Sequence, residues 1–130
     1  MTDEVAPARV LVVDDEADLR RLFTVVLTEG GYEVRDAANG AEALAIVHQW
    51  RPNVILLDLM MPVMNGWQFV DTYGGLNETE EARAPIIVIT AAGPGAVRST
   101  SSMGAISAVL SKPIDVDVLL EVVGYHVAHR

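Results

Sequence analysis

Five polar side chains in this sequence could act together on a charged substrate. Asp58 ends the apolar run Val-Ile-Leu-Leu, and the pair Asp14-Asp15 follows the run Val-Leu-Val-Val. Thr90 ends the run Ile-Ile-Val-Ile, and Lys112 stands before a proline. Unpaired carboxylates about 4 Å apart repel each other by roughly 1 to 4 kcal/mol at a surface-like dielectric. A hard divalent cation such as Mg²⁺ relieves that repulsion and commonly also takes a phosphate oxygen. These residue types therefore point to metal-assisted phosphate chemistry.

A carboxylate beside such a metal can attack phosphorus and form an aspartyl phosphate. Phosphoryl transfer depends on positioning and charge stabilisation more than on acid–base catalysis. Lys112 is suited to supply positive charge to the phosphoryl oxygens, and the Thr90 hydroxyl is suited to donate a hydrogen bond to them. Taken singly, however, Asp58 is more often a cap or a solvated loop acid than a reactive group, Thr90 is equally a structural turn hydroxyl, and Lys112 is an ordinary surface lysine. Only a fold that brings them together favours the chemical interpretation.

Short apolar runs and amphipathic segments alternate along the whole chain, which predicts five strand–helix units. We expect strands at residues 9–13, 32–36, 54–57, 86–89 and 107–110. We expect a first helix with Leu19, Leu22, Phe23, Val26 and Leu27 on one face and Gly30-Gly31 at its end. We expect a second helix capped by Asn39, a third capped by Asn65, a short or marginal fourth within Gly93–Gly104, and a fifth capped by Asp115.

This alternation predicts an α/β fold: a doubly wound parallel sheet of five strands between two layers of helices. The flavodoxin-like strand order 2-1-3-4-5 is the natural choice for five strands, and it places ligands at the carboxyl ends of strands one and three. Strand one ends before Asp14-Asp15 and strand three ends before Asp58. The predicted order thus brings the three carboxylates together, with Thr90 and Lys112 on neighbouring strands.

Length and composition limit the function classes. We expect one domain over residues 1–130, with a core of about residues 8–128. Cysteine is absent, which excludes disulfides and thiolate metal sites, and the net charge of −9 disfavours nucleic-acid binding. No apolar run reaches the roughly 18 residues of a membrane span, and no signal peptide is visible. A cytoplasmic domain without direct membrane or nucleic-acid contact is therefore expected.

The residues quoted above resemble the receiver domain of two-component response regulators over nearly the whole chain. The similarity lies in Asp14-Asp15 after the first strand, Asp58 in Leu-Leu-Asp-Leu-Met-Met-Pro-Val-Met-Asn-Gly, Thr90 in Ile-Val-Ile-Thr-Ala, and Lys112-Pro113. Each motif alone is weak. All four in order, each at the end of its own expected strand, make a strong resemblance.

The resemblance implies a role for each matching residue. Asp58 would accept a phosphoryl group from a histidine kinase or a histidine phosphotransfer protein. Mg²⁺ would be bound by Asp15 directly, by Asp14 largely through water, by Asp58, and by the backbone carbonyl of Met60. Thr90 and Lys112 would hold the phosphoryl group. Such a domain signals and catalyses only its own phosphorylation and dephosphorylation, so it is not expected to be a separate enzyme.

The resemblance also implies an output. Movement of Thr90 and Lys112 would switch the face formed by the fourth helix, fifth strand and fifth helix toward a protein target or an output domain outside this sequence. A phosphorylation-dependent dimer is left open.

Three departures from the family pattern bear on how the signal is read and how long it lasts. Many receivers carry an aromatic residue three positions before the lysine, where this chain has Val109. The segment Gly93–Gly104 is also unusually rich in Gly and Ser, so we expect its ordering to carry more of the switch. Met60 and Ala92 lack the polar groups that orient attacking water in some relatives, which predicts a phosphoryl group that persists.

The same residues and motifs bear on three other functions. A degenerate receiver that binds a partner without phosphorylation is disfavoured, because every required side chain is present. An aspartyl-phosphate hydrolase of the haloacid-dehalogenase kind would use Asp14 as nucleophile, but it usually needs a second aspartate where this chain has Glu16. A nucleotide-binding domain of the Rossmann kind is weaker still, because no Gly-x-Gly-x-x-Gly follows the first strand.

Overall fold

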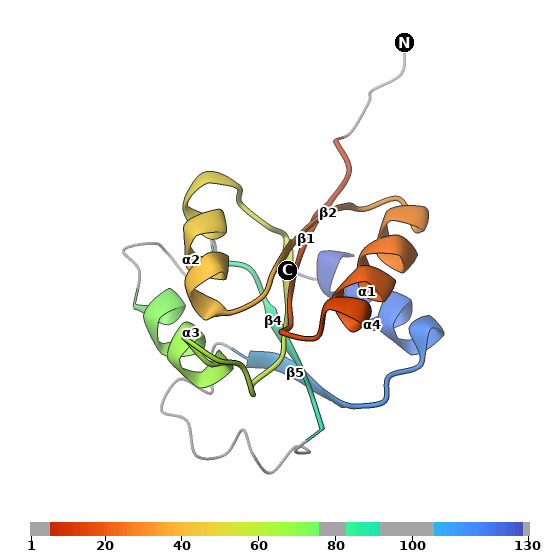
Figure 1. Ribbon diagram of the computed structural model, residues 1–130. Coiled ribbons are helices and arrows are strands. Elements are labelled where there is room, and N and C mark those ends of the chain that lie inside the picture. The colour runs from red at the N-terminus through yellow and green to blue at the C-terminus, as the bar shows by residue number, and fades with distance from the viewer. Residues whose placement is uncertain (1–5, 76–82, 92–105, 129–130) are drawn as a thin grey trace.

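A five-stranded parallel sheet forms the centre of the molecule (Figure 1). The computed structural model describes residues 6–75, 83–91 and 106–128. The strands follow the order β2-β1-β3-β4-β5, which confirms the predicted doubly wound topology. Their bounds are Arg9–Val13 for β1, Glu33–Ala37 for β2, Val54–Leu57 for β3, Ile86–Thr90 for β4 and Ile106–Ser111 for β5.

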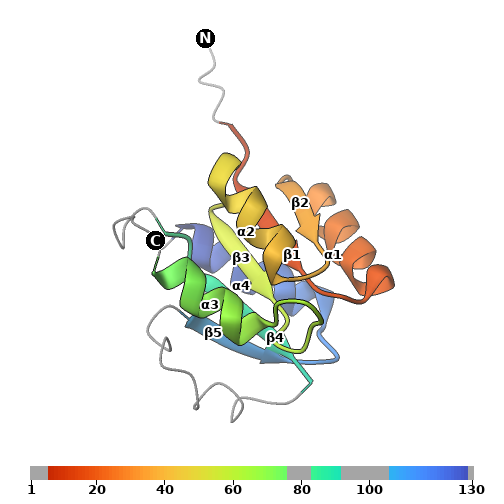
Figure 2. The same ribbon diagram turned by 60° about the vertical axis from the view of Figure 1, so that its left-hand side comes forward.

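Four helices in the described residues cover the two faces of this sheet. They are α1 (Ala17–Glu29), α2 (Gly40–Gln49), α3 (Gly66–Gly74) and α4 (Val116–Ala128). Helices α1 and α4 lie on one face and α2 and α3 on the other, so the molecule has the three predicted layers (Figures 1 and 2). The expected helix within Gly93–Gly104 lies outside the described residues, so α4 is the fifth helix of the sequence-based prediction.

The apolar runs form strands because their side chains are buried on both faces of the sheet. Along β1, β3 and β4, alternate residues enter two separate cores. One core lies under α1 and α4 and contains Val12, Leu56 and Ile89. The other lies under α2 and α3 and contains Val13 and Leu57. By contrast, β2 is an edge strand with exposed charged residues, as its alternating polarity predicts.

Side-chain caps fix where the helices begin. The Asn39 side chain accepts a hydrogen bond from the third residue of α2. Asn65 and Gln68 form a reciprocal capping box at the start of α3. Asp115 directly precedes α4, and its carboxylate accepts a hydrogen bond of 2.7 Å from the backbone N–H of Asp117. Three predicted caps are thus confirmed, and α1 ends at Gly30 as expected.

The apolar face predicted for the first helix is only partly buried. Leu22 belongs to this face, yet its side chain is 46% exposed. Phe23 and Leu27 are the buried residues of α1. The apolar stripe predicted from spacing is wider than the strip of α1 that contacts the sheet, so its margin at Leu22 faces solvent.

Within the described residues, every helix is too short or too polar to cross a membrane.

Candidate functional site

The sheet ladder itself places the candidate residues. Beyond the paired strand ends, the backbone N–H of Asp58 donates to the carbonyl of Val13 at 2.9 Å. At the other side of the sheet, the N–H of Lys112 donates to the carbonyl of Thr90 at 3.0 Å. Asp14 follows Val13 directly and its N–H bonds to the end of β2 at 3.1 Å. Parallel pairing therefore continues one residue past the strands and carries the polar residues to a single edge.

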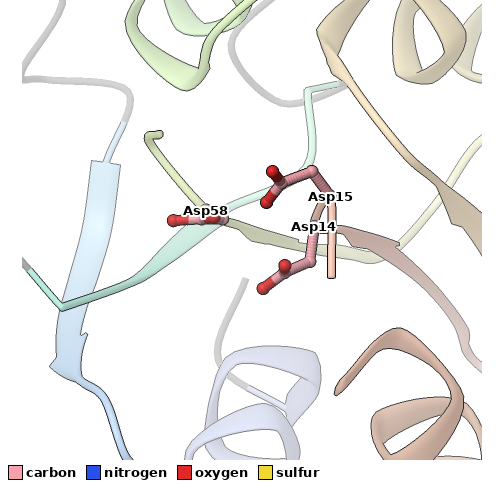
Figure 3. A group of neighbouring side chains, drawn as sticks. All are labelled: Asp14, Asp15 and Asp58. Carbon is pink, nitrogen blue, oxygen red and sulfur yellow. The ribbon is translucent and has the colours of Figure 1, made fainter. Parts of the chain in front are cut away.

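Three carboxylates meet at this edge (Figure 3). One oxygen each from Asp14, Asp15 and Asp58 lies within 4.8 Å of the others. Asp14 is 2% exposed and Asp58 is 5% exposed, whereas Asp15 is exposed to solvent. Oxygen donors so close together, with one of them open to water, fit a hard cation that keeps part of its hydration shell. The predicted convergence of the three acids is confirmed.

Lys112 reaches into the cluster from the end of β5. Its ammonium lies 3.0 Å from Asp14 Oδ2 and 3.5 Å from Asp58 Oδ2. A third contact, 3.2 Å to Glu16 Oε1, was not predicted from the sequence. In the sequence, Glu16 stands out only as a mismatch to a hydrolase motif. Its position as the third acid in the run Asp14-Asp15-Glu16 is the signal that could have found it.

Burial and charge shift the ionisation of two site residues. Burial, together with the neighbouring charges of Asp14 and Asp15, raises the pKa of the Asp58 carboxyl above its ordinary value of 3.8. The Lys112 ammonium and the N–H of Met60 act in the opposite direction but do not cancel that shift. Although burial alone lowers the pKa of Lys112, its contacts with Asp14 and the other acids raise it overall.

Thr90 and Met60 complete the predicted set. Thr90 is fully buried as the last residue of β4, the strand that pairs with β3. Met60 is exposed, and its N–H donates to Asp58 Oδ1 at 3.4 Å. The metal role of its carbonyl stays a prediction. Ala92 lies outside the described residues.

The loop after β3 also borders an open cavity of about 350 Å³ beside Asp15. Residues lining it include Met60, Pro62 and Trp67. Where α3 begins, a Cβ on Gly66 would lie 2.6 Å from the Asp58 carbonyl oxygen, so only glycine allows the helix to start this close to the site. The loop and α3 are therefore packed directly onto Asp58.

A parallel α/β domain with an acidic, lysine-bridged site at its carboxyl edge is thus defined, and the chain is similar to known proteins. The family described as the response regulator receiver domain matches residues 10–124. The chain is 32% identical over 116 residues to sporulation initiation phosphotransferase F of Bacillus subtilis, covering 88% of this chain and 90% of that protein. It resembles the solved chemotaxis response regulator CheY4 of Vibrio cholerae with a TM-score of 0.81 and 33% identity, over 92% of this chain and 98% of that one.

The chain belongs to the response regulator receiver domain family of two-component systems. Its acidic residues Asp14, Asp15 and Asp58 are typical of the phosphoacceptor site of that family. Other relatives are longer: a probable transcriptional regulator, ycf27, of Cyanophora paradoxa is 43% identical over 98 residues, which are 75% of this chain but 38% of that protein. The matched residues thus span well under half the length of that relative.

Proposed function

We propose that Asp58 accepts a phosphoryl group from a histidine kinase or a histidine phosphotransfer protein in a reaction that needs Mg²⁺. One observation carries the proposal: the Asp58 carboxylate is nearly buried, lies among two other acids, and has the Lys112 ammonium 3.5 Å away. A fold gains no stability by gathering these acids unless a cation or ligand binds there. The arrangement supports a nucleophile, a cation site and a counter-charge on one edge.

Each residue has a distinct part in this proposal. Asp14, Asp15, Asp58 and the carbonyl of Met60 would hold Mg²⁺, whose charge would neutralise the phosphoryl oxygens during transfer. Lys112 supplies a second positive charge to those oxygens, and its ammonium is already inside the cluster. The hydroxyl of Thr90 donates a hydrogen bond to them. Asp58 itself attacks phosphorus, and the bond from phosphorus to the donor's imidazole nitrogen breaks.

The partners and the setting are part of the same proposal. One relative bears the name of a phosphotransferase and another that of a transcriptional regulator. We propose that this chain is a cytoplasmic signalling domain that catalyses only its own phosphorylation and dephosphorylation, and that it passes the signal to a protein target or an output domain. The boundaries of one domain over residues 1–130 stay a prediction, as do dimerisation and the absence of nucleic-acid binding.

The decisive experiment is labelling with a small phosphodonor in the presence and absence of Mg²⁺, followed by mass spectrometric mapping of the modified residue. Wild type should gain one phosphoryl group on Asp58, and only with Mg²⁺. Asp58→Ala should lose the label, while Asp18→Ala, which removes an exposed acid from α1, should keep it. Label on Asp14 would favour the hydrolase alternative. Equal labelling of wild type and Asp58→Ala would overturn the proposal.

The lifetime and the output of the phosphorylated form are also proposed. Met60, exposed beside Asp58, offers water no polar side chain to align it, so the phosphoryl group should persist. Loss within seconds without a phosphatase would contradict this. The output face should include β5 and α4. In β5, Val109 is partly buried and packs against the core that lies under α2 and α3. The segment Gly93–Gly104, which we expect to order on phosphorylation, lies outside the described residues.

A further inference from the structure

Lys112 divides its charge among three acids in the resting protein. Its ammonium contacts Asp14 at 3.0 Å and Glu16 at 3.2 Å, and the contact with Asp58, at 3.5 Å, is the longest of the three. An ammonium has three protons to donate. The group that would stabilise a phosphoryl on Asp58 is therefore already held more closely by two other carboxylates.

The two competing acids differ in how easily they can let go. Asp14 is buried, and it accepts the backbone N–H of Glu16 at 2.8 Å as well as the Lys112 contact. The Glu16 side chain is 63% exposed. Since the Glu16 backbone is anchored by Asp14, only its side chain has to rotate for it to release Lys112. Water can solvate the freed carboxylate at once.

Release is also favoured by the position of Glu16 at the start of α1. Glu16 is the N-cap residue of this helix, yet its side chain makes no capping hydrogen bond. The N-terminus of a helix carries a partial positive charge that stabilises nearby anions. A Glu16 carboxylate freed from Lys112 therefore stays in a favourable field, and losing the ion pair costs little.

We propose that Glu16 is a positioning residue: it holds the Lys112 ammonium away from Asp58 in the resting protein and yields it when a phosphoryl group arrives. This inference rests on the proposed function. A phosphorylated aspartate carries about two negative charges in place of one, so it attracts Lys112 more strongly than before. The contact with Glu16 must then be given up or stretched. Glu16 thereby weakens the hold of the site on its phosphoryl group.

Three variants separate the effect of the Glu16–Lys112 contact from the effect of the Glu16 charge. Glu16→Gln removes the charge, Glu16→Asp keeps the charge but shortens the side chain by one methylene, and Asp18→Asn removes an equal charge from the first turn of α1 as a control. Affinity for beryllofluoride, an analogue of the phosphoryl group, is measured with saturating Mg²⁺. In the ligand-free proteins, the ¹⁵N resonance of the Lys112 ammonium reports whether the Glu16 contact exists.

Both Glu16 variants should bind beryllofluoride about two- to fivefold more tightly, the range expected for losing one exposed ion pair. Both should shift the Lys112 resonance, and Asp18→Asn should do neither. Unchanged or weaker binding by Glu16→Gln overturns the inference. So does equal tightening by Asp18→Asn, or wild-type behaviour of Glu16→Asp, because either result would show a general charge effect. If wild type binds no beryllofluoride, the proposed function fails, and the proposed role of Glu16 fails with it. If the Lys112 resonance is unchanged in both Glu16 variants, the resting Glu16–Lys112 contact is refuted, and the inference is overturned while the proposed function stands.

Discussion

At the scale of single residues, Asp58 is held in a site that opposes its own charge. Burial and the charges of Asp14 and Asp15 raise its pKa above 3.8, the value expected in the unfolded chain. Between that value and the folded pKa, the folded protein binds more protons than the unfolded chain. Stability therefore falls as the pH rises through this window. Where Asp58 is ionised, its charge therefore destabilises the fold, as is common where a reactive group is kept ready.

The neutral variant Asp58→Asn should therefore be more stable than wild type. We expect its free energy of unfolding at pH 7, without Mg²⁺, to rise by about 1 kcal/mol. The gain should shrink as the pH is lowered through the raised pKa of Asp58, because wild type then becomes neutral as well. Urea denaturation over a pH series measures both effects. Asp18→Asn, at an exposed position, should give no such gain, and a loss of stability in Asp58→Asn would refute the destabilising role of this charge.

At the scale of elements, the loop between β3 and α3 connects the acceptor to a helix that is packed tightly onto it. Gly66 permits that close approach, and Asn65 caps the helix. Between them and Asp58, Val63 adopts a φ of +68°, which is unfavourable for a β-branched residue. Its side chain is 82% exposed, so little packing offsets the strain.

Replacing Val63 by glycine should relieve this strain. We expect Val63→Gly to raise the free energy of unfolding by about 0.5 to 1 kcal/mol, since the lost strain exceeds the added entropy of the unfolded chain. Thermal denaturation monitored by circular dichroism measures the change. Val63→Ala keeps a Cβ at positive φ and should gain less. An equal gain for alanine would attribute the effect to the exposed isopropyl group, and a loss for glycine would contradict the strained conformation.

At the scale of the whole molecule, the chain carries a net charge of −9 and places three acids at one edge of its sheet. A cation that binds the folded protein, and not the unfolded chain, stabilises the fold by mass action. The acidic edge should therefore couple metal binding to global stability.

Addition of Mg²⁺ should raise the melting temperature, and chelation with EDTA should reverse the rise. At ten times the dissociation constant the gain is about 1.4 kcal/mol. Asp15→Asn should remove most of it, whereas Asp18→Asn should retain it. Calorimetry at matched ionic strength separates site binding from general screening of the acidic surface. A gain that NaCl reproduces, or that survives Asp15→Asn, would argue against a cation at this edge.

Much of this architecture could be predicted because its determinants are local. Apolar runs, the caps Asn39, Asn65 and Asp115, and the polar residues at the run ends are all visible along the chain. Parallel strands share one carboxyl edge, so Asp14, Asp58, Thr90 and Lys112 had to approach one another. Val109 and Met60, which depart from the family pattern, are also visible along the chain.

Only the tertiary structure decided the properties that depend on distances between atoms and on exposure to solvent. Spacing in the sequence shows which face of a helix is apolar but not how much of that face is buried, and Leu22 on the apolar face of α1 is exposed. The Lys112–Glu16 contact joins residues 96 positions apart through an exposed side chain, which no local pattern encodes. The raised pKa of Asp58 likewise depends on its burial and on its distances to Asp14 and Asp15, which raise the pKa, and to Lys112, which lowers it. The sequence alone determined which acids, and which lysine, come to one edge of the sheet. The packed fold added Glu16 and decided how Lys112 is shared among these acids, because ion-pair distances depend on every element that packs around them.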